Sequence, residues 1–339
     1  MKRVFLKDIA RDLSVSKTAV SLVLNNKGDE NKISQETQKR IIAYAKKHNY
    51  VPNQLARALS RGKTETIGLI IPNISDAFYA KMAGCVEQRA MELGYTVIFS
   101  SSKERPEKET GLIRAMLNRQ VDGLIIASTQ KNREDMVKLQ QLKFPFVLVD
   151  RHYPDLKTNY VVADNFEGTK KMTQHLIKNG RTRIGLVSIE SGLDAMQQRR
   201  LGYEHALSIA GHKAPGNYIK ELNAENHAQE MGQAILDMVK GQDSVDAIMF
   251  TTHYLAASGL RELKALGVKV PTEVAIISFD ELGAFDLVSP PITASKQPVE
   301  LMGNTAVELV VHEIEKKTAA PKGQRRLETQ LMVRKSCGS

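Results

Sequence analysis

The chain has 339 residues, 42% of them hydrophobic and 25% charged, and carries a formal net charge of +10. This composition is that of an ordinary globular protein and excludes a disordered or fibrous one, and the length predicts a small domain plus larger ones. No apolar run approaches the ~20 residues that span a bilayer. The basic N-terminus lacks the apolar core of a signal peptide, and two cysteines, Cys85 and Cys337, make neither a disulfide framework nor a metal cluster. We therefore expect a soluble, cytoplasmic protein with no membrane partner.

The first predicted elements are two short helices within residues 6–25. Apolar residues recur at helical spacing in residues 6–13 and again in residues 17–24. The segment between them leaves room only for a tight turn, and Ser16 is suited to cap the second helix. Such a pair forms a helix-turn-helix, whose second helix can enter the major groove of DNA. The side chains opposite its apolar stripe, which would face the bases, are Lys17, Thr18, Ser21 and Leu22.

The charge distribution supports a DNA partner for this segment. Residues 1–63 hold 14 Lys or Arg and 5 Asp or Glu, a net charge of +9, whereas residues 64–339 hold 34 and 33, a net charge of +1. A basic run is often only a solvated surface. Here nearly all of the net charge lies on the piece with the groove-sized helix, as expected of a module that binds phosphates. We therefore expect residues 1–63 to bind double-stranded DNA.

A third helix is predicted over residues 34–47 and completes a three-helix head. Pro52 then interrupts the helical pattern. Asn53 can cap a short helix over residues 54–60, which at barely two turns is too short to hold in water by itself. We expect this segment to fold only against a second copy of itself and a DNA groove.

From residue 66 onward, buried apolar strands alternate with helices, and a polar link near residues 159–165 separates two such sets. The predicted strands are IGLIIPN, TVIFSSS, VDGLIIAST, FPFVLVD, RIGLVSI, residues 217–222, DAIMFTT and VAIISFD. This pattern predicts two doubly wound parallel sheets in succession, each with helices on both faces. Ligands bind beyond the carboxyl ends of such strands. The polar residues found there are candidates for a cleft between two lobes: Asn73, Ser100, Ser128, Asp150, Thr252 and Asp280.

Several motifs, in this order, resemble the lactose-repressor (LacI/GalR-type) family of bacterial transcription regulators. They are the helix-turn-helix, YVPNQLARALSRGKT, IPNISDAFYAKM, VDGLIIAST, LVDRHYP, VADNFEGTKKMTQHLIKNGRTRIGLV, RRLGYEHAL and VAIISFDELGAFDLVSPPITASKQPVELMG. The resemblance covers essentially the whole chain. It implies a homodimeric or tetrameric regulator whose core is similar to a periplasmic sugar-binding protein and binds a small effector.

The resemblance also implies a division into domains. Residues 1–50 would be the helix-turn-helix domain, residues 51–63 the hinge helix and linker, and residues 64–339 the effector-binding and dimerisation core. Within that core, the first lobe would take in residues of about 64–164 and 293–322. The second lobe would take in residues of about 165–292 and 323–339.

The family's DNA contacts carry over by position. Lys17, Thr18 and Leu22 match base-reading positions, and four further residues match positions that commonly touch phosphate: Ser16, Ser21, Asn25 and Thr37. Leu59, which follows Asn53, Ala56 and Arg57 in the hinge, matches the leucine that wedges into the minor groove and bends the duplex. An ordinary dimer contact is the alternative for Leu59. Leu22 departs from the family, where this position is often polar, so its apolar contact with a thymine methyl predicts a different half-site.

The resemblance places a further set of residues at the effector cleft. They are Asn73, Asp76, Phe78, Tyr79, Ser128, Arg151, Asp164, Arg199 and Asp280. Aromatic faces can stack on a sugar, and Arg and Asp make charge-assisted bonds to hydroxyls. For Phe78, core packing explains the residue about equally well. Arg199 and Asp280 are harder to explain without a ligand, since unpaired charges near buried strand ends are costly unless a ligand or partner is present.

One departure from the family lies after a strand of the second lobe. Relatives usually carry an Asn-Asp pair where this chain has Thr252 and His253, and we include Thr252 in the predicted site. His253 either touches an anionic group or is a plain surface histidine, and the second interpretation is slightly favoured.

Two other functions fit the sequence less well. A nucleotide-dependent enzyme is disfavoured because there is no G-x-G-x-x-G motif, no P-loop, and no Ser-His-Asp or metal-ligand constellation. A cytoplasmic solute-binding protein without a regulatory role would not need a basic three-helix head. We therefore predict a non-enzymatic regulator without cofactors, most simply a repressor of carbohydrate-use genes, that binds a palindromic operator as a dimer. No apolar heptad zipper follows the core, which favours the dimer over the tetramer. A sugar is the predicted effector, and a nucleobase or sugar phosphate is the alternative.

Overall fold

The computed structural model describes residues 4–50, 62–212, 216–240, 243–315 and 323–339. The chain divides into two compact units, Met1–Thr64 and Glu65–Ser339, which are described separately. None of the described helices is long and apolar enough to cross a membrane.

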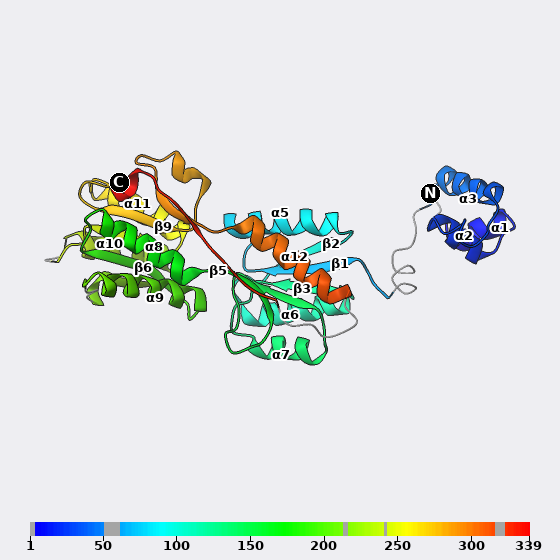
Figure 1. Ribbon diagram of the computed structural model, residues 1–339, viewed down its shortest axis with the longest axis horizontal. Coiled ribbons are helices and arrows are strands. Elements are labelled where there is room, and N and C mark those ends of the chain that lie inside the picture. The colour runs from blue at the N-terminus through cyan, green and yellow to red at the C-terminus, as the bar shows by residue number, and fades with distance from the viewer. Residues whose placement is uncertain (1–3, 51–61, 213–215, 241–242, 316–322) are drawn as a thin grey trace. The chain divides into compact units, whose positions relative to one another are not determined.

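In its described residues, 4–50 and 62–64, the first unit forms a bundle of three helices, as the sequence predicts for this segment (Figure 1). They are α1 (Leu6–Asp12), α2 (Lys17–Leu24) and α3 (Gln35–Lys47). The hydroxyls of Ser16 and Ser34 accept hydrogen bonds from backbone N–H groups in the first turns of α2 and α3, respectively. One apolar side-chain cluster joins the three helices: Ile9, Ala10, Val20, Val23, Ile41 and Ala45.

The second unit contains two six-stranded sheets. The first has the strand order β11-β5-β4-β3-β1-β2, and the second has the order β12-β10-β9-β8-β6-β7. Among the described residues, every strand pair is parallel except β10 with β12, which is antiparallel. The strands of the first sheet are β1 (Thr66–Ile71), β2 (Thr96–Ser101), β3 (Gly123–Ile126), β4 (Phe146–Val149), β5 (Asn159–Ala163) and β11 (Gln324–Leu327). Those of the second are β6 (Ile184–Glu190), β7 (Ile219–Asn223), β8 (Ala247–Phe250), β9 (Ala275–Phe279), β10 (Thr293–Lys296) and β12 (Gln330–Met332).

Helices cover both faces of the first sheet (Figure 1). Alternate residues of β1 point to opposite faces: Leu69 packs in a cluster with side chains of two helices, and Ile70 packs in another cluster with side chains of two others. The first pair of helices is α5 (Ala77–Glu92) and α12 (Val299–Glu315), and the second pair is α6 (Pro106–Asn118) and α7 (Arg133–Gln141). We call this sheet with its four helices the first lobe.

The second lobe is built in the same way around the second sheet. Val187 and Leu186 of β6 belong to separate apolar clusters, each of which includes side chains of one helix pair. The helices on the Val187 side are α10 (His227–Lys240) and α11 (His253–Ala265), and those on the Leu186 side are α8 (Asn165–Lys178) and α9 (Asp194–Ile209). The described part of this unit also contains three short 3-10 helices: Gly216–Tyr218, Gly283–Asp286 and Lys335–Cys337.

Strand pairing differs from two of the sequence-based expectations. The predicted polar link at residues 159–165 contains β5, whose backbone pairs with β4 and β11 and whose Val161, Val162 and Ala163 side chains are buried. In addition, β10 pairs with β9 and so lies in the second sheet, although residues 293–322 were assigned to the first lobe. Likewise β11 lies in the first sheet, although residues 323–339 were assigned to the second. The chain therefore crosses between the lobes after β10 and again after β11, at positions that only the strand pairing reveals.

Candidate DNA-binding helix and effector pocket

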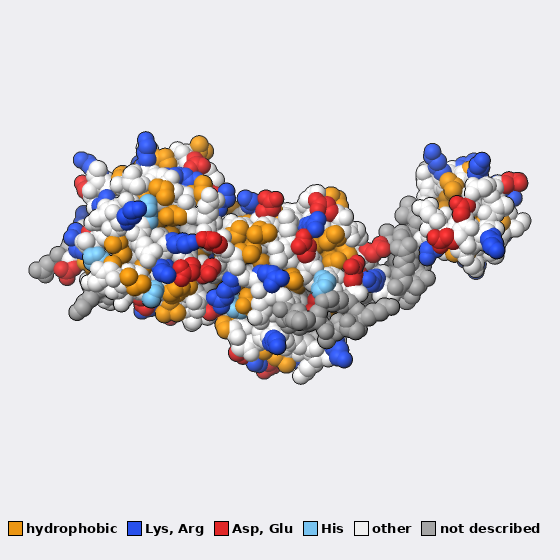
Figure 2. Space-filling model, viewed as in Figure 1, with side chains coloured by type: hydrophobic (Ala, Val, Ile, Leu, Met, Phe, Trp, Pro, Cys, Tyr) orange, Lys and Arg blue, Asp and Glu red, His pale blue; other side chains and the backbone are white. Residues whose placement is uncertain are grey.

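Helix α2 turns its predicted base-reading side chains toward solvent. Lys17 and Thr18 are exposed, and Ser21 and Leu22 are partly exposed, whereas the apolar stripe of this helix is buried in the three-helix core. Leu22 is not among the described side chains that pack on that core. This leucine is therefore free to make the apolar contact expected of it. Figure 2 shows Lys and Arg side chains at several places on the visible face of this unit.

The predicted phosphate-contacting residues lie at helix ends, where backbone groups need partners. The Ser16 hydroxyl accepts a hydrogen bond from the backbone N–H of Ala19 at 3.0 Å. The Asn25 side-chain amide donates to the carbonyl oxygen of Ser21 at 2.7 Å. Thr37 lies in the first turn of α3, where its hydroxyl accepts from the Ser34 hydroxyl at 2.9 Å. The four predicted hinge contacts lie outside the described residues: Asn53, Ala56, Arg57 and Leu59.

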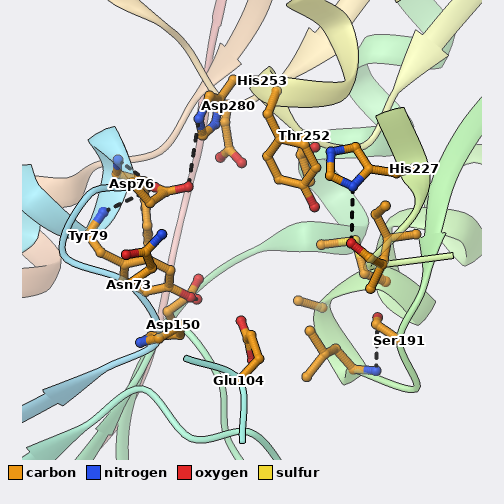
Figure 3. A pocket seen from close by; sticks show the side chains of 18 of the residues that line it. Asn73, Asp76, Tyr79, Glu104, Asp150, Ser191, His227, Thr252, His253 and Asp280 are labelled. Atoms are coloured by element: carbon orange, nitrogen blue, oxygen red, sulfur yellow. Dashed lines mark hydrogen bonds and ion pairs between the residues drawn. The ribbon is translucent and has the colours of Figure 1, made fainter. Parts of the chain in front are cut away.

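The second unit contains a pocket with a volume of about 1280 Å³ that is lined by both lobes (Figure 3). Its walls come from the residues that follow β1, β2, β3, β4, β8, β9 and β10, from the ends of β6 and β7 and the residues after them, and from the N-terminal parts of α5, α9, α10 and α11. It therefore lies beyond the carboxyl ends of parallel strands, the position that the doubly wound pattern predicts. Of the residues predicted for the effector site, those that line the pocket are Asn73, Asp76, Phe78, Tyr79, Arg151, Arg199, Thr252 and Asp280.

The Arg199 guanidinium contacts hydrogen-bond acceptors, a carboxylate and an aromatic ring. Its Nε donates to Asn165 Oδ1 at 2.8 Å, and its Nη1 donates to the backbone oxygen of Thr251 at 2.5 Å. The Asp280 carboxylate lies 3.6 Å from Nη1, and the guanidinium carbon lies 3.7 Å from the centre of the Phe279 ring. These contacts compensate for the burial of the charge and place the Arg199–Asp280 pair at the pocket wall.

Arg151, Asp150 and Tyr79 form a second buried group. The Tyr79 hydroxyl donates to Asp150 Oδ2 at 2.7 Å, and Arg151 Nε lies 3.7 Å from the same oxygen. Burial raises the pKa of both Asp150 and Tyr79. Burial alone would lower the pKa of Arg151, but its neighbours Tyr79, Glu104 and Asp150 outweigh burial and raise that pKa. The guanidinium therefore stays charged at the pocket wall.

The side chains of Asp76, from the first lobe, and His253, from the second, lie next to each other at the pocket (Figure 3). Asp76 caps α5 by accepting hydrogen bonds from the backbone N–H groups of Phe78 and Tyr79, at 2.8 and 3.4 Å. Its other oxygen lies 3.9 Å from His253 Nε2. The His253 side chain is only 12% exposed, and its Nδ1 is buried without a hydrogen-bond partner. The surface-histidine interpretation was therefore wrong, because the first turn of α11 directs this ring into the cleft.

Ser128 and Asp164 do not line the pocket. Ser128 is completely buried, and its hydroxyl donates to Glu109 Oε1 at 2.8 Å and lies 3.0 Å from the Tyr153 hydroxyl. Asp164 caps α8 by accepting from the backbone N–H of Glu167 at 3.1 Å. Both side chains are thus engaged in local structure. A role for either in binding an effector stays a prediction.

Phe78 shows that the two interpretations considered for it are compatible. Its ring is partly buried against the core of the first lobe, and it also lines the pocket. The ring lies edge-on to that of Tyr79, with centroids 5.1 Å apart. One side of the Phe78 ring therefore faces the pocket at the N-terminal end of α5, and the other side packs against the core.

Other pocket residues were missed by the sequence analysis. Glu104 follows β2, and the position of Ser100 at the end of the same strand already indicated this loop. Gln297 follows β10, inside a motif quoted for the family resemblance, and its Nε2 donates to Asp280 Oδ1 at 2.5 Å. His227 and Tyr254 begin two helices and pack ring against ring, with centroids 5.2 Å apart. No periodicity in the sequence distinguishes these positions from ordinary helix starts.

Comparison with protein families gives two matches along the chain. Residues 5–53 match the family described as bacterial regulatory proteins, lacI family, and residues 64–334 match the periplasmic binding proteins and sugar-binding domain of the LacI family. The second match alone spans most of the chain. The protein belongs to the LacI family.

Individual relatives of this LacI-family protein agree along their whole length. Catabolite control protein A of Priestia megaterium is 30% identical, with 93% of this chain and 94% of the relative covered. The ribose operon repressor of Halalkalibacterium halodurans is 28% identical, with 92% and 91% covered. Among solved structures, the complex of the transcriptional regulator CelR with cellobiose is 26% identical, covers 98% of this chain and 100% of its own, and has a TM-score of 0.72.

The LacI-family protein is thus a helix-turn-helix transcriptional repressor with an effector-binding domain, as the sequence predicts. In this family member, the helix-turn-helix lies within the matched residues 5–53, and the two-lobed core holds the pocket. No group of three or more His, Cys, Asp or Glu side chains within the described residues is arranged to hold a metal ion.

Proposed function

We propose that this repressor binds a pseudo-palindromic operator as a homodimer and that a small, sugar-like effector in the pocket between the lobes regulates this binding. The observation that carries the proposal is the coexistence, in one chain, of an exposed helix α2 on a basic unit and a large two-lobed pocket. A twofold-symmetric dimer presents two such helices to two half-sites, which explains why operators of helix-turn-helix dimers are palindromic.

The chemistry of the pocket supports a sugar rather than a flat, apolar ligand. Tyr79, Phe78 and Tyr254 supply aromatic surface, and paired charges such as Arg199 and Asp280 supply donors and acceptors that are already in place. Hydroxyl groups can both donate to carboxylates and accept from guanidinium groups, so a polyol satisfies both kinds of partner. CelR, a structural relative of this chain, is solved in complex with cellobiose, and the ribose operon repressor is named for a sugar operon.

A thermal-shift screen tests the effector class. The full-length protein is melted with each member of a panel of pentoses, hexoses, disaccharides, nucleobases and sugar phosphates. A ligand present at 100 times its Kd stabilises the folded state by about 2.7 kcal/mol, which is well above the error of such a measurement. Stabilisation by free sugars supports the proposal, and stabilisation by nucleobases alone would refute a sugar effector.

Operator binding is tested separately by selecting bound sequences from a random duplex library and footprinting the selected site. A protected inverted repeat is expected, with an affinity that falls steeply as the salt concentration rises. Selection of one unpaired half-site by a monomer would contradict the dimer.

A further inference from the structure

The two terminal guanidinium nitrogens of Arg151, which we call its fork, already bind a carboxylate of the chain itself. Arg151 Nη1 donates to Glu104 Oε2 at 2.8 Å, and Nη2 donates to Glu104 Oε1 at 2.8 Å. This is the bidentate arrangement in which a guanidinium binds a carboxylate or a phosphate most strongly. The remaining contacts of Arg151 point away from the fork, to the backbone oxygen of Ser128 at 3.2 Å and to Asp150. Glu104 therefore occupies the position that an anionic ligand would take.

The two partners differ in exposure. The Arg151 side chain is 9% exposed, whereas the Glu104 side chain is 54% exposed, and both line the pocket. Figure 3 shows the Glu104 side chain on its loop at the cavity. The glutamate thus covers the guanidinium from the accessible side. If its carboxylate were absent, the fork of a buried, permanently charged arginine would open to ligands.

The backbone at Glu104 has an unusual conformation. Glu104 and its neighbour Lys103 both have a φ of 58°, in the left-handed region that residues other than glycine rarely adopt. The turn is fixed by hydrogen bonds from the backbone N–H of Lys103 to the Pro72 oxygen at 2.8 Å and from that of Arg105 to the Ser102 oxygen at 3.3 Å. Such a conformation persists only where its surroundings impose it. The bidentate pair with Arg151 is one such constraint.

The charge balance of the pocket points the same way. Five carboxylates line it: Asp76, Glu104, Asp150, Glu190 and Asp280. Four Lys or Arg side chains line it: Lys131, Arg151, Arg199 and Arg261. The two buried arginines are both paired with carboxylates. An anionic ligand would have to displace Glu104, whose local concentration is high because it is tethered, and would leave that carboxylate facing the ligand's own charge.

We infer that Glu104 is a specificity-determining residue: its tethered carboxylate fills the anion-binding fork of Arg151, so the pocket takes uncharged, hydroxyl-rich ligands and rejects phosphorylated or carboxylated ones. The choice of sugars as the accepted class rests on the proposed function. The exclusion of anions by Glu104 does not, because it can be measured with a simple anion and no effector.

The test uses inorganic phosphate as the probe and the full-length protein, with phosphate titrated against chloride at constant ionic strength in a calorimeter. The variant Glu104→Ala opens the fork, and Glu190→Ala is the matched control because it removes another exposed carboxylate from the same pocket. We expect Glu104→Ala to bind phosphate at least tenfold more tightly than the wild type, and Glu190→Ala to match the wild type. Glu104→Gln, which retains one acceptor oxygen, should fall between them.

Several results would overturn the inference. Equal phosphate affinity in the wild type and Glu104→Ala would show that the carboxylate excludes nothing, and no binding to Glu104→Ala would show that the Arg151 fork is no anion site. An equal gain in phosphate affinity in Glu190→Ala would show that the effect comes from the overall charge of the pocket and not from the Arg151 fork. Stabilisation of the wild type by sugar phosphates more than by the parent sugars would also refute it. If no sugar binds any variant but the phosphate results hold, only the proposed effector class fails.

Discussion

The Asp280 carboxylate lies 3.6 Å from the Arg199 guanidinium, and both groups are buried at the wall of the pocket. The pair belongs to the fold as well as to the candidate site, because Arg199 Nη1 also donates to the Thr251 backbone and Arg199 Nε to Asn165. A buried charge here therefore does not by itself demand a ligand. Each of the two charges already has a partner of opposite charge within the protein.

This relationship predicts the effect of Asp280→Ala. Removing one member of a buried ion pair typically costs about 3–5 kcal/mol, because the remaining charge is left without compensation. We expect a loss of that order in the free energy of unfolding of the core, measured by urea denaturation, together with loss of the ligand-induced thermal shift. Asp280→Asn retains the shape and should unfold nearer to wild type while still losing most of the response. Wild-type stability of Asp280→Ala would show that the pair is unimportant for folding.

Lys17→Ala tests the recognition helix. Lys17 is exposed at the first position of α2, where it matches a base-reading position of the family. Loss of a good base contact costs about 1–3 kcal/mol and relaxes sequence preference at one position of each half-site. Binding-site selection with the variant should show this relaxation. If affinity falls equally for all sequences, Lys17 contacts phosphate instead. Lys27→Ala, at an exposed lysine beyond the C-cap of α2, is the matched control.

The hinge prediction concerns residues outside the described part of the chain. Residues 54–60 are too few to form a stable helix alone, so we expect them to fold only with the partner hinge on a bent operator. Leu59→Ala should then weaken specific operator binding and leave the effector affinity of the free protein unchanged. Amide exchange should find residues 54–60 unprotected without DNA and protected with it. Strong protection in the free protein would contradict coupled folding.

Apart from β5, the sequence predicted the order of helices and strands as far as β9, because the hydrophobic period changes clearly from helical spacing to short buried runs. It also predicted that ligand-facing residues follow strands, and most of the residues chosen on that basis line the pocket. It could not distinguish Ser128 from Asn73, because both follow a strand. Only packing shows that Ser128 turns toward Glu109, on the face of the first sheet covered by α6.

Two other features depend on long-range pairing that no local pattern encodes. The sequence reading took β5 for part of a polar link, since its apolar run of residues 161–163 is short and lies between Asn159 and Asp164. Asn159 is nevertheless buried, and its Oδ1 accepts from the Gly323 backbone at 2.7 Å. Similarly, the partner of Glu104 lies 47 residues away. The sequence can place each of these residues near a strand end, but the pairing follows only from the assembled sheet.

Gly202→Ala tests the packing of α8 on α9. A Cβ atom at Gly202 would lie 2.3 Å from the backbone oxygen of Phe166, so the two helices would have to separate. Overpacking of this kind typically costs about 1–3 kcal/mol. Gly111→Ala is the matched control, since a Cβ at this exposed position of α6 meets nothing within 4 Å. It should instead stabilise by about 0.5–1 kcal/mol through helix propensity. Urea denaturation should therefore show a lower free energy of unfolding for Gly202→Ala and a higher one for Gly111→Ala than for the wild type.

The buried environment of His152 predicts that the second unit loses stability in mild acid. Its side chain is 5% exposed, its Nδ1 lies 3.7 Å from Asp194 Oδ2, and its ring packs on that of Tyr160 with centroids 4.3 Å apart. Burial lowers the pKa of His152, with a further lowering from Arg326 and only partial compensation by Asp194. The folded state therefore takes up a proton less readily than the unfolded state, whose histidine titrates near its ordinary value of about 6.5.

The sign of the effect follows from this difference. Above pH 6.5 both states hold a neutral imidazole, and the contribution of His152 to stability is fully present. As the pH falls below 6.5 and through the lower pKa of the folded state, the unfolded state binds the proton first, so stability is lost by at most about 1.4 kcal/mol per pH unit. We expect the free energy of unfolding of the core, measured from pH 8 to pH 5, to fall less steeply below pH 6.5 in His152→Gln than in the wild type. His312→Gln, at an exposed histidine of α12, is the matched control for the substitution itself. An unchanged slope in His152→Gln would mean that this imidazole titrates alike in both states.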